Sequence, residues 1–112
     1  MKVLFIAPEE KPVVKEIGDS LHDMQEAVSG YIQALYPWRD EVALICNEEG
    51  KLLGLPFNRP LFDDRGNMID ILVGSFFLCL APNDSDQFLD FPDHLVEQYT
   101  QIFASMYINI SR

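Results

Sequence analysis

Apolar residues recur along the chain in short blocks separated by polar turns, a pattern typical of strands. The blocks at 2–7 and 41–46 are almost wholly apolar, as expected for strands buried on both faces. Three more strands are predicted, at 13–17, 31–36 and 68–73. A turn bracketed by prolines joins the predicted strands at 2–7 and 13–17, so we expect these two strands to form a hairpin.

Two stretches repeat their apolar residues with the period of a helix. Ser20 begins the first, because its hydroxyl can accept from the free amides of the first turn and Asp23 suits the positive helix start. Gly30 ends it, since glycine enters a left-handed cap at little cost. The second helix begins at Pro92. Its apolar stripe consists of Leu95, Val96, Tyr99, Ile102, Phe103 and Met106.

The region after the strand 41–46 is less regular. Residues 47–50 are polar or flexible and predict a turn, after which 51–53 is expected to return as the other arm of a hairpin. Gly54, Pro56 and Pro60 argue against a long regular element from there to Leu61.

The block 74–80 leaves two alternatives open: it continues the preceding strand or starts a buried helix, and periodicity does not separate them. Taken together, the elements predict a single α+β domain over residues 1–112. We expect a mostly antiparallel sheet of about five strands, with two helices.

The net charge of −10 is unevenly placed, because no Lys or Arg lies between Arg65 and Arg112. Acidic residues fill this interval, among them Asp84, Asp86, Asp90, Asp93 and Glu97. Direct binding to nucleic acid or to an anionic membrane is not expected, since it requires a basic face. Two interpretations stay open: a solvated acidic face, or a surface that meets a basic partner or imitates the phosphates of DNA.

Cys46 and Cys79 both lie in apolar blocks and are predicted to be reduced core residues. The apolar start of the chain is too short for a signal peptide, and the longest apolar stretch, 69–82, is interrupted by Asp70 and is too short to span a membrane. We therefore expect a cytoplasmic protein.

Catalytic and metal-binding patterns are missing from the sequence. His22 and His94 are the only imidazoles and lie far apart, and no glycine-rich phosphate loop occurs. Glu48 and Glu49 beside Cys46 would raise the pKa of its thiol, which disfavours a nucleophile. We expect neither a metal nor a cofactor, and no enzymatic activity.

A set of polar residues between positions 47 and 59 lies in an otherwise apolar region, and it has two interpretations. In the first, Asn47 stabilises the turn and Arg59 pairs with Glu48 or Asp63. In the second, Lys51 and Arg59 bind a nucleotide-like anion. The side-chain amides of Asn47 and Asn58 complete this candidate ligand site. It consists of Asn47, Lys51, Asn58 and Arg59. Tyr31, Tyr36 and Trp38 either add a stacking wall to it or pack in the core.

Several short motifs together resemble the domain-of-unknown-function 3846 family across roughly residues 1–105. They are MQ at 24–25, VSGYI at 28–32, YP at 36–37, ALICNEEGK at 43–51, LP at 55–56, NR at 58–59 and ILVGSFF at 71–77. This chain has Ser29-Gly30 where the family has two glycines. The resemblance provides no catalytic motif. It implies a small cytosolic product of a bacterial mobile element or phage.

The leading expectation is a non-enzymatic interaction or inhibitor protein of a mobile element, which binds another protein through its acidic surface. The alternative is a domain that binds a nucleotide-like anion near residues 47–59. The exposed edges of a small sheet also make a homodimer plausible.

Overall fold

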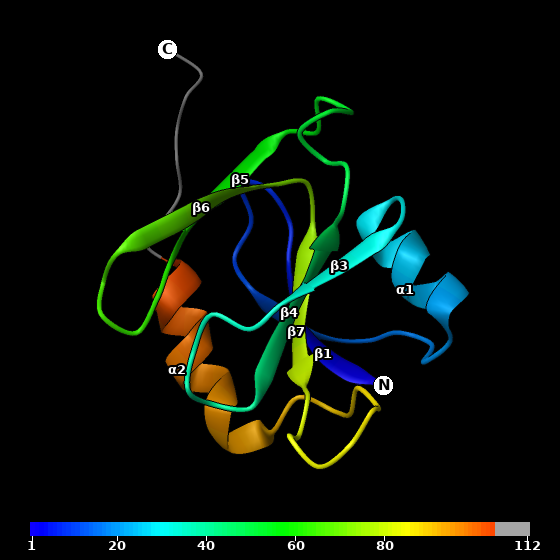
Figure 1. Cartoon of the computed structure of the whole chain (residues 1–112), viewed down its shortest axis with the longest axis vertical. Coiled ribbons are helices and arrows are strands. Elements are labelled where there is room, and N and C mark those ends of the chain that lie inside the picture. Colours follow the sequence, from blue (N-terminus) through cyan, green and yellow to red (C-terminus); the bar gives the residue numbers. More distant parts are fainter. Residues whose placement is uncertain (105–112) are drawn as a thin grey trace.

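The computed structural model describes residues 1–104, which form a five-stranded sheet, a two-stranded ribbon and two helices (Figure 1). The elements in chain order are β1 (Lys2–Ile6), β2 (Val13–Glu16), α1 (Leu21–Val28), β3 (Ile32–Leu35), β4 (Val42–Asn47), β5 (Phe57–Phe62), β6 (Met68–Val73), β7 (Phe76–Leu80) and α2 (Asp93–Ala104). Met106 and the rest of the tail lie outside the described residues.

The main sheet has the strand order β2-β1-β7-β4-β3, and each neighbouring pair is antiparallel. The predicted hairpin of β1 and β2 is present. Strands β5 and β6 pair with each other as a separate antiparallel ribbon. The predicted α+β fold with a mostly antiparallel sheet is therefore confirmed. The predicted strand at 68–73 forms as β6, but it pairs with β5 in the ribbon, and β7 takes the fifth place in the main sheet.

Strand β4 runs through the centre of the fold and is buried along its whole length. Val42, Leu44 and Cys46 point to a cluster that includes the inner side of α2 and of the ribbon, whereas Ala43 and Ile45 point to a cluster that includes α1. The sheet is thus the middle of three layers, with α1 on one face and α2 and the ribbon on the other (Figure 1).

The start of α1 is capped as its sequence predicts. The Ser20 hydroxyl accepts from the Asp23 amide at 3.0 Å, and the Asp23 carboxylate accepts from the Ser20 amide. The end differs, because Ser29 with φ 65° takes the left-handed position expected of Gly30. Gly30 instead lies against Asn47, where an added Cβ would come within 2.6 Å of the Asn47 amide nitrogen.

The hairpin expected after β4 does not form. The turn continues beyond residue 50, with the Leu53 amide donating to the Glu49 carbonyl oxygen at 2.9 Å. Both edges of β4 are already paired, with β3 and β7, so no edge is left for a return strand.

The segment predicted to be irregular forms β5, in spite of Pro60. A proline is tolerated there because each strand of a two-stranded ribbon has one edge without ladder hydrogen bonds. Gly74, with φ +73°, then turns the chain from the ribbon into the main sheet, and 76–80 forms strand β7 and not a helix.

The two cysteines are free and buried, and they point to opposite faces of the sheet. The two helices within residues 1–104 lack the length and apolar character needed to cross a membrane.

Candidate functional site

Arg59 and Asn58 lie inside the protein, where β5 meets the end of β1 and the last turn of α2. The Arg59 side chain is fully buried. Its guanidinium donates to the backbone carbonyl oxygens of Phe103 at 2.9 Å, Ala7 at 3.1 Å and Glu10 at 2.5 Å. A further bond joins it to the Asn58 side-chain oxygen at 2.7 Å.

Asn58 extends this network on the other side. Its amide nitrogen donates to the carbonyl oxygens of Ile6 at 3.0 Å and Gly74 at 2.8 Å. Its side chain is 2% exposed. The two residues thus fasten the ribbon to β1, to the turn before β7 and to α2, and they present no surface to a ligand. A brace at Arg59 was one of the two expectations, but these partners are carbonyl oxygens and not Glu48 or Asp63.

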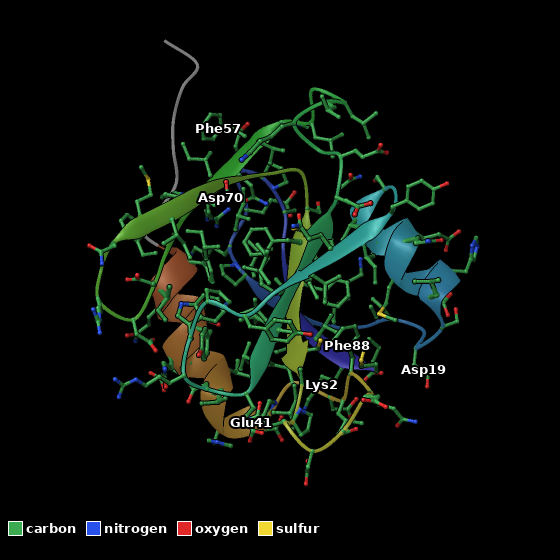
Figure 2. The ribbon with its side chains drawn as sticks, viewed as in Figure 1. Lys2, Asp19, Glu41, Phe57, Asp70 and Phe88 are labelled. Carbon is green, nitrogen blue, oxygen red and sulfur yellow. The ribbon has the colours of Figure 1, made fainter. Side chains whose placement is uncertain are left out.

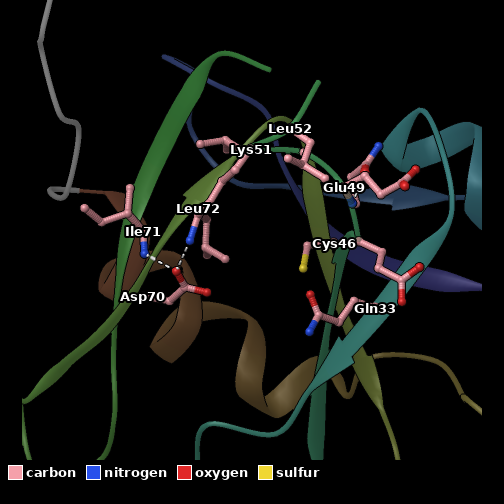
Figure 3. Close-up of a pocket in the computed structure, with 12 residues that line it drawn as sticks. Gln33, Cys46, Glu49, Lys51, Leu52, Asp70, Ile71 and Leu72 are labelled. Carbon is pink, nitrogen blue, oxygen red and sulfur yellow. Dashed lines mark hydrogen bonds and ion pairs between the residues drawn. The ribbon is translucent and has the colours of Figure 1, made fainter. Parts of the chain in front are cut away.

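Asn47 and Lys51 lie elsewhere, on a cavity of about 140 Å³ between β4 and β6 (Figure 3). Asn47 uses its side chain locally, donating to the Val28 carbonyl oxygen at 3.0 Å and accepting from the Glu49 amide at 2.8 Å. The Lys51 ammonium pairs with Asp70 at 2.5 Å. The four residues predicted to form one ligand site are therefore divided between two places.

The lining of this cavity is predominantly acidic. Glu48, Glu49 and Asp70 contribute carboxylates, against the single ammonium of Lys51, which Asp70 already neutralises. A nucleotide-like anion would meet like charge here, so the anion interpretation gains no support from the charges. Within the described residues, no group of three His, Cys, Asp or Glu side chains is placed to hold a metal ion.

Cys46 lines the cavity together with Gln33 and Asp70 (Figure 3). The pKa of the Cys46 thiol is raised to about 11, chiefly by burial and also by the Asp70 carboxylate, while Lys51 acts in the opposite direction. A thiol held in its protonated form is a poor nucleophile, which agrees with the expected core role.

The five predicted acidic residues all lie at one end of the molecule, and all five are exposed. Asp84 and Asp86 are on the loop that follows β7, and the chain then passes through Asp90 into α2, which carries Asp93 and Glu97 (Figure 1). Glu41, which directly precedes β4, lies at the same end (Figure 2). We call the surface formed by Glu41, Asp84, Asp86, Asp90, Asp93 and Glu97 the acidic end.

Two sets of contacts hold the acidic end in place. Lys2 donates its amide to Asp90 at 2.8 Å and pairs its ammonium with Asp93, whose hydrogen bond raises the Lys2 pKa. The Glu41 carboxylate accepts from the Asn83 amide at 2.6 Å. The acidic end therefore combines segments that are distant in sequence. The Lys2 ammonium is a cation that is already paired with a carboxylate of this surface.

A groove of about 460 Å³, which no sequence pattern predicts, opens beside the acidic end. Tyr36 at the end of β3 lines it together with Pro82, Asp86 and Phe88. The sequence predicts Tyr36 either in a stacking wall of the ligand site near Asn47 or in the core, whereas it is exposed and lines this other groove. Nothing local in the sequence indicates that Tyr36 and the loop 82–88 line the same groove. Trp38, considered with it, packs in the core against Tyr99 and Phe103.

The outer face of the β5–β6 ribbon is apolar and open. Met68 and Ile69 are each more than half exposed. A shallow groove of about 510 Å³ runs across this face, lined by Phe57, Met68, Ile69, Ile71 and Val73, with Lys51 and Asp70 at its border.

Comparison with known proteins places the chain in a family but assigns no activity. The model of the family described as Domain of unknown function (DUF3846) matches residues 1–104. The chain belongs to the DUF3846 family. No curated protein and no solved structure matches the chain significantly. The predicted family resemblance is thus confirmed, whereas the family description carries no function.

Proposed function

We propose that this DUF3846 protein is a non-enzymatic binding protein whose acidic end holds a basic surface of another protein. The observation that carries the proposal is the convergence of exposed carboxylates from the residue before β4, from the loop 82–90 and from α2 on one end of the molecule. Carboxylates gathered in this way create a negative potential that steers and orients a basic partner.

The loop that carries Asp84 and Asp86 is tied to the sheet, which favours binding without a large ordering cost. The amide of Ala81 donates to the Glu41 carbonyl oxygen at 2.7 Å, and Leu80 and Leu89 exchange two backbone hydrogen bonds of 2.9 and 2.8 Å. The carboxylates are thus presented on a supported loop.

A protein face that otherwise contacts nucleic acid is the type of partner that this surface fits. Such faces present Lys and Arg at the positions of phosphates. An acidic end that occupies them would act as an inhibitor, and this is the role that we propose for a protein of a mobile element.

The proposal is tested by neutralising the acidic end and measuring retention on immobilised polylysine across a salt gradient. The variant carries Asp84→Asn, Asp86→Asn, Asp90→Asn and Asp93→Asn. A matched control removes four exposed carboxylates elsewhere, with Glu9→Gln, Asp19→Asn, Glu26→Gln and Glu48→Gln. We expect the first variant to elute at much lower salt than the control, although both have the same net charge. Equal elution of the two would show that only net charge matters, and would overturn the proposal.

The alternative proposal, a nucleotide-like anion at the cavity of Asn47 and Lys51, is the weaker of the two. Lys51 would have to exchange Asp70 for the ligand, next to Glu48 and Glu49. A rise in melting temperature with millimolar nucleotide, lost in Lys51→Ala, would support it.

A second copy of the chain is the partner that fits the outer face of the ribbon. This face is apolar, and its charged border residues, Lys51 and Asp70, neutralise each other. Each copy carries a net charge of −10, so two copies repel each other over most of their surfaces. At the outer face of the ribbon, the facing groups would repel little.

A further inference from the structure

The groove beside the acidic end has an aromatic wall that the fold leaves exposed. Tyr36 directly follows β3 and is 62% exposed. On the other side, Ala81 and Phe88 are partly buried against the core cluster that includes α1, so this part of the groove is anchored. An aromatic ring on one side and a supported loop on the other form a slot that is open to solvent.

The loop side of the slot has a defined backbone conformation. The Ser85 amide donates to the Pro82 carbonyl oxygen at 3.1 Å, and the Gln87 amide donates to the Ser85 hydroxyl at 3.1 Å. Asp86 lies between these two bonds and lines the groove. The lining of the slot therefore combines apolar surface at Ala81 and Pro82, an aromatic ring at Tyr36 and a carboxylate at Asp86.

These three features match the parts of an arginine side chain. Its methylene stem covers apolar surface, its planar guanidinium stacks on an aromatic ring, and its forked donors bind a carboxylate. A phosphate or carboxylate ligand would meet Asp86 and the neighbouring acidic end. A purely apolar side chain would leave the carboxylate without a partner.

We infer that the groove between Tyr36 and the loop 82–88 receives an arginine side chain of the partner protein. This inference rests on the proposed function, because the acidic end supplies the charge complementarity that brings a basic segment to the groove. It adds a specific requirement: the partner is recognised by arginine more strongly than by lysine, whose ammonium is a compact point charge that lacks the planar fork.

The test uses two fluorescent peptides that differ only in carrying three arginines or three lysines, with affinity measured by anisotropy. For the wild type we expect the arginine peptide to bind about two- to fivefold more tightly, the range of an exposed cation–aromatic contact. Tyr36→Ala should remove this preference and Tyr36→Phe should keep it, because the ring and not the hydroxyl forms the contact. Asp86→Asn should weaken the arginine peptide more than the lysine peptide.

Tyr31 offers a matched control, since it is 64% exposed and precedes β3 as Tyr36 follows it. Tyr31→Ala should bind both peptides as the wild type does. Thermal melts establish that each variant is folded.

Equal affinity of the two peptides for the wild type, or a preference unchanged in Tyr36→Ala, would overturn the arginine slot. The proposed function would survive that result if the variant with four Asp→Asn substitutions still bound both peptides more weakly than the control that lacks four carboxylates elsewhere. If that variant bound like the control, the proposed function itself would be overturned.

Discussion

Arg59 on β5 donates from Nε to the backbone carbonyl oxygen of Phe103, 2.9 Å away in the last turn of α2. Carbonyls in the last turn of a helix lack an intrahelical partner, and they form the negative end of the helix dipole. Within its described bounds, α2 has no basic residue of its own in that turn. Within the described residues, a guanidinium from the ribbon therefore supplies a hydrogen bond and a positive charge to the last turn of α2.

Replacing Arg59 should strongly destabilise the fold. In Arg59→Lys one ammonium cannot reach the carbonyl oxygens of Phe103, Ala7 and Glu10 together, so buried acceptors lose their donors. We expect the free energy of unfolding to fall by about 3 kcal/mol or more, measured by urea denaturation. Arg65→Lys, at an exposed turn position, is the control and should unfold at the wild-type urea concentration. Coincident curves for the two variants would show that the buried network contributes little.

Gly74 should tolerate alanine less well than Gly66. Both have positive φ, of +73° and +82°, but a Cβ at Gly74 would lie 2.7 Å from a methyl carbon of Leu55, whereas a Cβ at Gly66 meets nothing within 4 Å. Gly66→Ala should cost only the backbone strain, about 1 kcal/mol, and Gly74→Ala about 2–3 kcal/mol. The difference in melting temperature between the two variants measures the contact with Leu55. Equal losses would mean that this side chain moves aside freely.

Both thiols should react slowly and only at high pH. Burial raises the pKa of Cys46 to about 11 and that of Cys79 to about 12. At pH 8 a thiol with a pKa of about 11 is about 0.1% thiolate. The variant Cys79→Val keeps Cys46 as its single thiol. We expect this thiol to be alkylated about two orders of magnitude more slowly in the folded protein than in the same variant unfolded in urea. Equal rates in the native and unfolded protein would contradict the raised pKa.

The same shifts predict how stability depends on pH. The unfolded chain releases its thiol protons near pH 8.5–9, whereas the folded protein keeps them until about pH 11. The thiol contribution to the free energy of unfolding is therefore complete below pH 8.5 and is lost as the pH rises through 11. Replacing both cysteines with valine should flatten the decline between pH 9 and pH 11 in urea titrations.

The outer face of the ribbon should control self-association. If two copies meet there, Ile69→Lys places a charge in the apolar contact and should weaken dimerisation at least tenfold, as measured by sedimentation equilibrium. Leu21→Lys introduces the same change at a comparably exposed position on α1 and is the control. A dimer that persists in Ile69→Lys, or is lost equally in both variants, would place the contact elsewhere.

Some features of this protein follow from short stretches of sequence. The capping box of Ser20 and Asp23 and the two almost wholly apolar strands, β1 and β4, depend on neighbouring residues, and they form as predicted. Even the exposure of Asp84 and Asp86 follows from their polar loop. Local patterns of this kind suffice because a cap or a strand period needs only a few consecutive residues.

Other features were decided by which strands found partners. The sequence predicted a hairpin after β4, but β7 occupies the edge that a return strand would need, and residues 57–62 pair with β6 instead. Arg59, a candidate anion ligand in the sequence, is buried because β5 folds over the end of β1 and the last turn of α2.

The sequence by itself determined the fold class, the family and the uneven charge of this chain. Only the tertiary structure decided what the polar residues do: it divided Asn47 and Lys51 from Asn58 and Arg59, and it brought Tyr36 and Asp86 to the same groove. The physical reason is that composition and periodicity act between neighbours in sequence, whereas the burial of a guanidinium or the opening of a groove depends on segments that meet only when the sheet is complete.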